Sequence, residues 1–412
     1  MSYSLSPDQA EALRQIGAWY RSGSRPYLTL GGYAGTGKTT LIAYLRQKLR
    51  EFDDEATVAF CAYTGKAARV LQEKLKEQKV PRRKDSVSTI HSLIYTAEEV
   101  PGGPGGGLGS GVTGSEGGTP VWTLKESLDR DLIIVDEASM VDEAVWKDLL
   151  SFGIPVLAVG DHGQLPPVGS SFNLMADPMI RLERIYRQAA ESPIIEMAAL
   201  ARATGELPVR EYGAGVRKLD RAQPETGLIV QEFLESWRPN LLILCGYNKT
   251  RVGLNAAIRA ARDIESAEPV SGDQVVCLRN NRRARVYNGM TGRVRRCVPV
   301  PAHLDRERLW YEAEIDLDGE DYGFTGYILR EQFGAAETVK RPPLAPDGKP
   351  GDLWDFGYAL TVHKAQGSQA ERVLIFEERF PRSSDEDWRR WLYTAVTRAE
   401  LELTVIGPDP EV

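Results

Sequence analysis

Residues 32–39 read GYAGTGKT and combine the residue types that bind a nucleoside triphosphate. The glycines let the backbone turn tightly, so that successive N–H groups point into one concavity at the positive end of a helix. Lys38 adds a mobile positive charge for the β- and γ-phosphates, and the Thr39 hydroxyl can coordinate Mg²⁺. The spacing is that of a Walker A phosphate loop, which predicts ATP and Mg²⁺ as cofactors.

A pair of carboxylates, Asp136 and Glu137, follows the apolar run 132–135. In an ATPase, Asp136 would hold Mg²⁺ through a water molecule and Glu137 would polarise the attacking water. Asp-Glu after an apolar run is common in itself, but downstream of a phosphate loop it indicates an ATPase site. Gln164 follows the next apolar run, and its amide can both donate to and accept from a γ-phosphate. A plain turn is the alternative for this last position.

Parallel strands are needed to bring these side chains together. Apolar runs at 27–30, 56–62, 132–135 and 155–160 are continuous rather than alternating, and segments with helical periodicity follow them. This pattern indicates a parallel sheet covered on both faces, and therefore the α/β fold class. Ligands bind at the carboxyl ends of the strands in such a sheet, which is where the polar residues lie.

A second α/β region begins near residue 181. Between about residues 271 and 351 the pattern changes to short β-rich runs separated by turns, which predicts a small inserted β-barrel or sandwich. Residues 101–120 contain ten of the 39 glycines and show no periodicity. We interpret this stretch as a flexible loop or a disordered tip.

The charge distribution leaves two readings of nucleic-acid binding open. The net charge of −7 argues against such a partner, yet residues 274–304 contain no acidic residue. This stretch either contacts backbone phosphates or forms a solvated basic face that pairs with nearby acids. Its arginines are Arg279, Arg282, Arg283, Arg285, Arg293, Arg295 and Arg296.

The chain of 412 residues has an ordinary globular composition, with 42% hydrophobic and 26% charged residues. Its four cysteines are far apart and form no CxxC pair, so we predict buried thiols, a reducing compartment and no zinc site. No apolar run approaches the roughly 18 residues of a membrane span, and the first residues lack a signal-peptide pattern. We therefore expect a cytoplasmic protein.

Taken in order, the motifs resemble those of superfamily 1 DNA helicases of the RecD/Dda-like (5′→3′) branch, across nearly the whole chain. Eight segments carry the resemblance, at residues 32–39, 62–68, 88–91, 136–139, 160–168, 185–188, 358–368 and 392–399. The resemblance implies two RecA-like P-loop domains with ATP in the cleft between them, and an SH3-like inserted β domain. The implied boundaries are 1–94 with 121–180 for the first RecA-like domain, 95–120 for a glycine-rich insertion, 181–270 with 352–412 for the second RecA-like domain, and 271–351 for the β domain.

The same resemblance implies roles for individual residues. The catalytic residues would be Lys38, Glu137, Gln164 and two arginine fingers, Arg187 and Arg398. Nucleotide would contact Gln9, Gly35, Thr36, Gly37, Lys38, Thr39, Thr40 and Gly367, and Thr39 and Asp136 would hold Mg²⁺. Single-stranded DNA would contact Tyr63, Thr64, Lys66, Thr89, His91, Tyr247, Asn248, Thr361 and His363. In the family, the position of Gln9 reads adenine, whereas the local sequence equally allows a solvated glutamine in a first helical turn.

The resemblance implies an ATP-dependent DNA helicase that moves 5′→3′ on single-stranded DNA and unwinds forked duplexes. It would be a monomer with replication or recombination proteins as partners. Two alternatives stay open, namely an RNA-directed ATPase of the same fold and an ATP-gated clamp that binds DNA without travelling.

Three departures from the family pattern qualify these expectations. The glycine-rich stretch stands where the family has a β-hairpin pin, so we expect a flexible wedge or one built around Val121 and Trp122. Gln369 replaces a common acid, which predicts a weaker ribose contact. The chain has no long N-terminal region of the kind found in exonuclease-complex subunits, which favours a free-standing enzyme.

Overall fold

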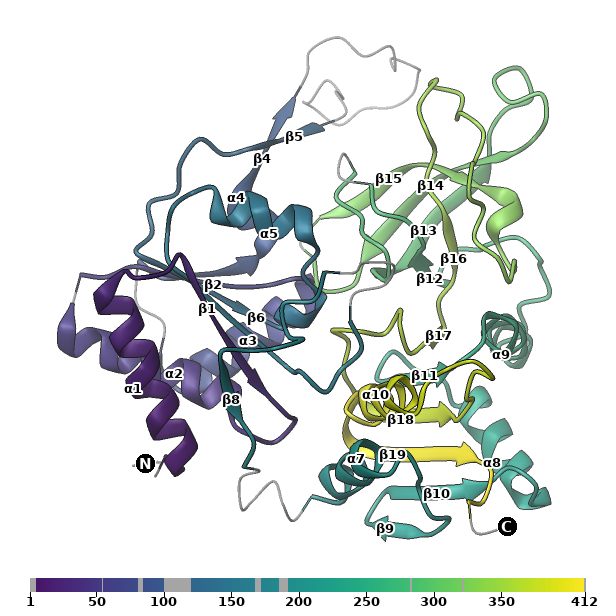
Figure 1. Ribbon diagram of the computed structural model, residues 1–412. Coiled ribbons are helices and arrows are strands. Elements are labelled where there is room, and N and C mark those ends of the chain that lie inside the picture. Colours follow the sequence, from purple (N-terminus) through teal and green to yellow (C-terminus); the bar gives the residue numbers. More distant parts are fainter. Residues whose placement is uncertain are drawn as a thin grey trace. The chain divides into compact units, whose positions relative to one another are not determined.

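The computed structural model describes residues 5–53, 55–80, 84–99, 120–166, 172–184, 192–281, 284–320 and 322–410. The chain divides into two compact units. The first comprises Met1–Ile94, Ser127–Tyr247 and Leu360–Val412, and the second comprises Tyr95–Glu126 and Asn248–Ala359. The first unit carries two six-stranded sheets, and the second carries a five-stranded and a two-stranded sheet (Figure 1).

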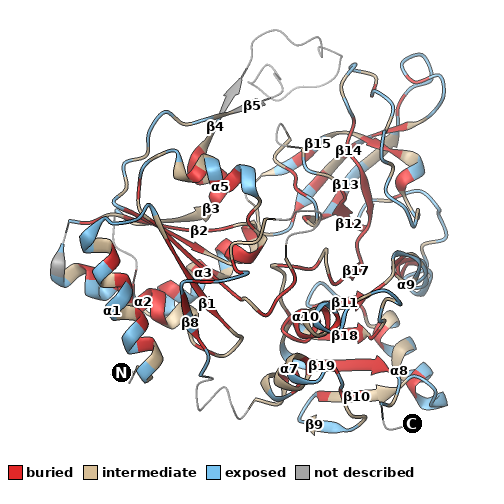
Figure 2. Cartoon of the chain, viewed as in Figure 1, coloured by how far each residue is buried: buried red, intermediate tan, exposed pale blue. Residues whose placement is uncertain are grey.

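The first six-stranded sheet is entirely parallel, as the continuous apolar runs predict, and its strand order is β3-β2-β6-β7-β1-β8. Its strands are β1 (Tyr27–Gly32), β2 (Val58–Ala62), β3 (Ser86–Thr89), β6 (Leu132–Asp136), β7 (Val156–Gly160) and β8 (Ile180–Leu182). The helices of this part are α1 (Pro7–Ser22), α2 (Lys38–Phe52), α3 (Gly65–Glu77), α4 (Ile90–Ile94) and α5 (Glu143–Leu150), with the 3₁₀ turn η1 (Ala138–Met140). Figure 2 shows burial running along β1 and β2.

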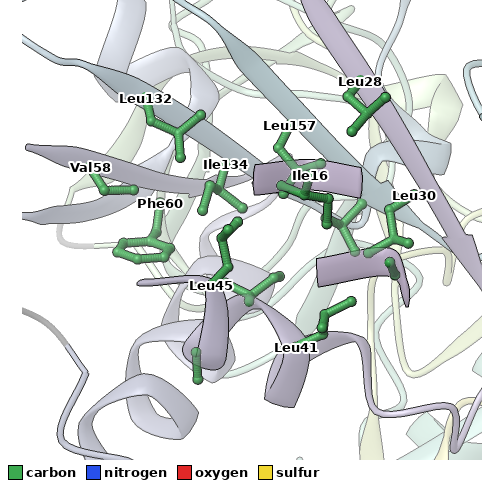
Figure 3. Packing of buried hydrophobic residues seen from close by; sticks show 14 of the residues in the cluster. Ile16, Leu28, Leu30, Leu41, Leu45, Val58, Phe60, Leu132, Ile134 and Leu157 are labelled. Atoms are coloured by element: carbon green, nitrogen blue, oxygen red, sulfur yellow. The ribbon is translucent and has the colours of Figure 1, made fainter. Parts of the chain in front are cut away.

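The core of this part is built by the apolar faces of α1 and α2 against the sheet. Ile16 from α1 and Leu41 and Leu45 from α2 pack with the strand residues Leu30 and Leu157, and all five are at most 2% exposed (Figure 3). Each such aliphatic side chain contributes roughly 1.5–3 kcal/mol through burial. This core fixes the first turn of α2, where the phosphate loop ends.

The second six-stranded sheet has the order β17-β11-β18-β19-β10-β9. Its strands are β9 (Glu211–Gly213), β10 (Val216–Asp220), β11 (Leu241–Cys245), β17 (Ala359–Thr361), β18 (Ala370–Phe376) and β19 (Ala399–Gly407). β11, β18, β19 and β10 pair in parallel, and β9 joins the edge antiparallel. The helices of this part are α7 (Pro193–Ala203), α8 (Pro224–Glu235) and α10 (Asp385–Val396).

The five-stranded sheet of the second unit has the order β15-β14-β13-β12-β16, and the pairings that the structure gives for it are antiparallel. Its strands are β12 (Gln274–Cys277), β13 (Thr291–Pro299), β14 (Trp310–Leu317), β15 (Gly323–Leu329) and β16 (Trp354–Phe356), and α9 (Asn248–Ala261) and the 3₁₀ turn η2 (Arg330–Gln332) belong to the same unit. Two ion pairs inside this unit, Arg251–Asp355 at 2.6 Å and Arg259–Asp273 at 3.1 Å, are almost fully buried.

The basic run at 274–304 finds acidic partners across the sheet. β13 pairs with β14, and Arg295 lies 2.6 Å from Asp316. Arg296 lies 3.6 Å from Glu312 and 3.7 Å from Glu314. For these two arginines, the contacts favour the second of the two readings, a solvated basic face that pairs with nearby acids. The acids follow residue 304 in the sequence, so only strand pairing reveals them. Arg282 and Arg283 lie outside the described residues.

A hairpin stem flanks the glycine-rich stretch. β4 (Tyr95–Glu99) and β5 (Pro120–Leu124) pair antiparallel, with Ala97 opposite Trp122. Val121 and Trp122, around which one of the two expectations placed the wedge, lie in β5 of this strand pair. Valine, tryptophan and threonine in β5 have high strand propensity, which was the available signal. Residues 100–119 lie outside the described residues. Across the described ranges, no helix has the length and apolar character needed to span a membrane.

Candidate functional site

The phosphate loop has the predicted strand–loop–helix context. It follows β1, and α2 begins at Lys38 with Gly37 as its N-cap. Gly35 and Gly37 have φ angles of 79° and 78°. These left-handed conformations favour glycine, which explains why the residue type is needed at both positions. The Thr36 side chain is buried and donates a hydrogen bond of 2.8 Å to the Tyr33 carbonyl, which closes the turn.

The Lys38 ammonium contacts the backbone of the phosphate loop. Its Nζ donates to the carbonyls of Gly32 at 2.7 Å and Tyr33 at 3.1 Å, and lies 3.9 Å from Asp161 Oδ2. Two of these partners are neutral carbonyls, so an anionic phosphate oxygen can compete for the ammonium.

The two predicted acids lie at the end of β6. Burial, reinforced by the charge of Glu137, raises the pKa of Asp136 to about 6, although the Lys38 ammonium acts in the opposite direction. Glu137 has a φ angle of 52°, which is unusual for a residue other than glycine, and its N–H donates to Asp136 Oδ1 at 3.0 Å. A buried carboxylate whose ionisation is unfavourable, as at Asp136, suits a divalent cation with oxygen ligands.

Among the buried polar atoms of the described residues that have no hydrogen-bond partner, two belong to predicted site residues and are acceptors, Glu137 Oε2 and Gln164 Oε1. Such atoms are costly unless a ligand or water satisfies them. The other amide atom of Gln164, Nε2, donates weakly to Asp161 Oδ2 at 3.4 Å. Glu137 and Gln164 line the same cavity, so a water molecule there could donate one hydrogen bond to each.

This cavity measures about 540 Å³ and lies within the first unit. It brings together ten of the residues predicted for catalysis, nucleotide binding or Mg²⁺ binding, namely Gly35, Gly37, Lys38, Thr39, Thr40, Asp136, Glu137, Gln164, Gly367 and Arg398. Gln369 also lines it, together with Lys66 and Lys74 of α3. Lys66, which we expected at DNA, thus lies on the wall of the nucleotide cavity.

Arg398 supplies the cavity with a cation from the second six-stranded sheet. Its side chain is buried, with the residue 1% exposed. Its guanidinium donates to Thr394 O at 2.9 Å, Ser368 O at 3.3 Å and Thr397 Oγ1 at 3.1 Å. Among the described residues it has no acidic partner, and a buried cation without a counterion is stabilised by an anionic ligand. Arg187, the other expected finger, lies outside the described residues.

The Gln9 side chain caps α1 and forms a hydrogen bond with the phosphate loop. Its Nε2 donates to Thr36 O at 2.9 Å, and its Oε1 accepts from Ser6 N at 3.1 Å. At 1% exposed, it is not the solvated glutamine that local sequence allowed. It is not among the residues that line the cavity. The adenine contact therefore stays a prediction.

The expected DNA ligands near the first sheet include an aromatic pair. The rings of Tyr63 and His91 meet edge to face at 5.5 Å, and Tyr63 Oη donates to Asp142 Oδ2 at 3.3 Å. Thr64 caps α3 by accepting from Ala67 N, and Thr89 Oγ1 accepts from Ser92 N at 3.1 Å. These threonines position the helix starts that follow β2 and β3.

A second aromatic group lies near the second six-stranded sheet. Tyr247 packs edge to face on Phe380 at 4.9 Å, and the His363 ring lies 6.5 Å from the same phenyl ring. Burial lowers the pKa of His363, so it is neutral at pH 7. Thr361 is buried, and Asn248, in the second unit, accepts a hydrogen bond from Arg251.

The structure also reveals two site residues that sequence reasoning missed, Asp161 and Tyr393. The Tyr393 hydroxyl donates to Asp161 Oδ2 at 2.7 Å and accepts from Ala34 N at 2.7 Å. Asp161 directly follows β7, and this position at the end of a parallel strand was the available signal. Nothing in the local sequence distinguishes Tyr393 from a core aromatic residue.

Comparison with known proteins places these features in context. The family model described as AAA domain matches residues 4–221, and that of the UvrD-like helicase C-terminal domain matches residues 356–406. The ATP-dependent RecD2 DNA helicase of Deinococcus radiodurans is 32% identical over 417 residues, covering 96% of this chain and 48% of that protein. The RecBCD enzyme subunit RecD of Mycobacterium tuberculosis is 25% identical, and the match covers 94% of this chain and 68% of that protein.

Among solved structures, the Pif1 helicase from Bacteroides in complex with ADP-AlF3 and ssDNA is similar, with a TM-score of 0.47 and 17% identity over 98% of this chain and 92% of that one. The chain spans about half the length of the RecD2 relative.

Proposed function

Because the chain belongs to the AAA domain family, we propose that it is a superfamily 1 helicase of RecD type, which hydrolyses ATP to move along single-stranded DNA and unwind duplexes. The direction we propose is 5′→3′, and the substrate is a forked duplex. One observation carries the proposal: Lys38, the two acids, Gln164 and Arg398 line one cavity. These are the charge types that phosphoryl transfer requires.

The residues of the cavity have separate roles in ATP binding and hydrolysis. The loop N–H groups and Lys38 bind the phosphates, and Thr39 and Asp136 hold Mg²⁺, which neutralises developing phosphate charge when bound. Glu137 accepts a proton from the attacking water, and Gln164 orients that water through its free oxygen. The unsatisfied carboxylate and amide oxygens support this assignment, since a water bound there would satisfy both.

Arg398 acts on the γ-phosphoryl group from the second sheet. A guanidinium held by neutral acceptors can exchange them for phosphate oxygens, which are charged and therefore stronger acceptors. Arg187 would be a second finger. Bringing Arg398 onto the nucleotide pulls the two sheet-bearing parts together, and loss of the γ-phosphate releases them.

DNA contact is assigned to two aromatic groups, Tyr63 with His91 and Tyr247 with His363. Aromatic rings stack on bases without regard to sequence, which suits a translocating enzyme. We propose the β4–β5 hairpin as the strand-separating element and the five-stranded sheet as an SH3-like domain. The domain boundaries inferred from the sequence are part of the same proposal.

Unwinding of a forked duplex that carries either a 5′ or a 3′ single-stranded tail tests the proposal. We expect ATP-dependent unwinding from the 5′ tail, and none for Lys38→Ala, which loses phosphate binding. Equal unwinding by Lys38→Ala would refute the site. DNA binding and ATPase activity without unwinding would indicate the clamp, and stronger ATPase stimulation by RNA than by DNA of equal length would indicate the RNA-directed enzyme.

A further inference from the structure

The hydroxyl of Tyr393 joins α10 to the phosphate loop. It accepts a hydrogen bond from the backbone N–H of Ala34 in the loop and donates one to Asp161 Oδ2, both at 2.7 Å. Asp161 Oδ2 lies in turn 3.9 Å from Lys38 Nζ. A phenol has one proton to donate, and here both its donor and its acceptor capacity are used inside the first unit.

The surroundings of Tyr393 keep this arrangement rigid. The residue is 2% exposed, and burial followed by the charge of Asp161 raises the pKa of Tyr393 well above its ordinary value, so it stays a donor. The ring packs beside Gly163, where an added Cβ would lie 3.0 Å from Tyr393 and 2.9 Å from Tyr33. A side chain at 163 would therefore press against both tyrosine rings.

Neighbouring side chains hold the same segment. Thr394 Oγ1 accepts from Leu165 N at 2.9 Å, and Gln366 Nε2 donates to Leu165 O at 2.7 Å. The segment at residues 161–166, which carries Gln164, is thus held by three side chains, two from α10 and one from the loop between β17 and β18. These contacts fix the position of α10 relative to Gln164 on the wall of the cavity.

Arg398 takes its position from the same helix. Its Nε donates to the carbonyl of Thr394, and its backbone N–H donates to that of Ala395. Thr394 directly follows Tyr393, so a shift of the Tyr393 anchor moves the carbonyl that holds the guanidinium. The geometry of α10 therefore links the phosphate loop to Arg398 through a few covalent and hydrogen bonds.

We propose that Tyr393 is a positioning residue for ATP hydrolysis: its hydroxyl sets the distance of Arg398 from the phosphate loop by bonding Ala34 and Asp161. This inference rests on the proposed ATPase function. It assigns Tyr393 no contact with the reacting atoms. Its effect is exerted through Arg398, so it should be seen in turnover more than in nucleotide binding.

Tyr393→Phe tests this role, because it removes the hydroxyl and keeps the ring. We expect kcat of the DNA-stimulated ATPase to fall about tenfold, which corresponds to about 1.4 kcal/mol. The KM for ATP should change less than about threefold, since Lys38 and the other loop N–H groups remain. Tyr212→Phe is the matched control, because the Tyr212 hydroxyl also makes a hydrogen bond with the backbone, donating to Pro208 O at 3.0 Å, but away from the cavity.

A double-mutant cycle separates positioning from general weakening of the fold. In an Arg398→Lys background, which loses the guanidinium fork, Tyr393→Phe should reduce kcat by less than about twofold further, because the group it positions is gone. Tyr212→Phe should leave kcat unchanged in both backgrounds. Thermal melting of each variant checks that the fold is retained.

Three outcomes would overturn the inference: unchanged kcat in Tyr393→Phe, an equal loss of kcat and ATP affinity, or a full tenfold effect that persists in Arg398→Lys. A wild-type chain without DNA-stimulated ATPase would instead refute the proposed function. The two failures are therefore distinguishable in one set of assays.

Discussion

Replacing Asp136 with asparagine should stabilise the protein in the absence of nucleotide while it abolishes hydrolysis. Burial and the neighbouring Glu137 raise the pKa of Asp136 from 3.8 to about 6. One pKa unit corresponds to 1.36 kcal/mol, so the ionised carboxylate costs the folded state about 3 kcal/mol. Asparagine carries no charge, and its Oδ1 can still accept the hydrogen bond from the Glu137 N–H.

The sign of the pH dependence follows from the raised pKa. Above pH 6 the Asp136 carboxylate is ionised in both the folded and the unfolded chain. The folded state then bears the full free-energy cost of burying this charge. As the pH falls through 6 toward 3.8, the folded protein binds the proton first and the penalty disappears. At pH 5 about half of this cost remains.

Thermal melting at pH 8 and pH 5, without nucleotide or metal, measures this difference. A chain of this size shifts by roughly 1–2 °C per kcal/mol, so Asp136→Asn should raise the melting temperature by about 3–6 °C at pH 8 and about half as much at pH 5. Asp129→Asn, at an exposed carboxylate, is the control and should change neither value. The reasoning fails if Asp136→Asn melts no higher than wild type at pH 8, or if its gain is equal at both pH values.

Two further substitutions test the cavity and the second unit. Arg398→Ala should reduce turnover far more than ATP affinity, because the guanidinium acts on charge that develops during hydrolysis; equal losses, measured by steady-state kinetics and nucleotide binding, would contradict a finger role. Asp273→Ala should lower the free energy of unfolding by about 3–5 kcal/mol, because it leaves the buried Arg259 without its carboxylate. Asp316→Ala, at the exposed pair with Arg295, should lower the free energy of unfolding by less than about 1 kcal/mol. Urea titration measures both variants, and similar losses in the two would refute the distinction between the buried and the exposed ion pair.

Much of the nucleotide site could be predicted from local sequence. A glycine-rich turn between a strand and a helix has few alternatives, because Gly35 and Gly37 must adopt φ angles near 80°. The carboxylates at the end of β6 and the amide after β7 follow from one rule, that parallel strands end at a common edge. Local sequence left two readings of Arg295 and Arg296 open, because the acids that β14 places opposite them lie outside the basic stretch.

The amino-acid sequence by itself determined the phosphate loop, the parallel α/β character and the order of the motifs, because each depends on spacing within one strand, loop or helix. Only the tertiary structure decided that Arg398 lines the same cavity as Lys38, and that a tyrosine hydroxyl of α10 bonds the loop. Such contacts join residues several hundred positions apart, and their geometry is set by the packing of helices on two sheets. No local periodicity encodes that packing, which is why Tyr393 could not be told from an ordinary core residue.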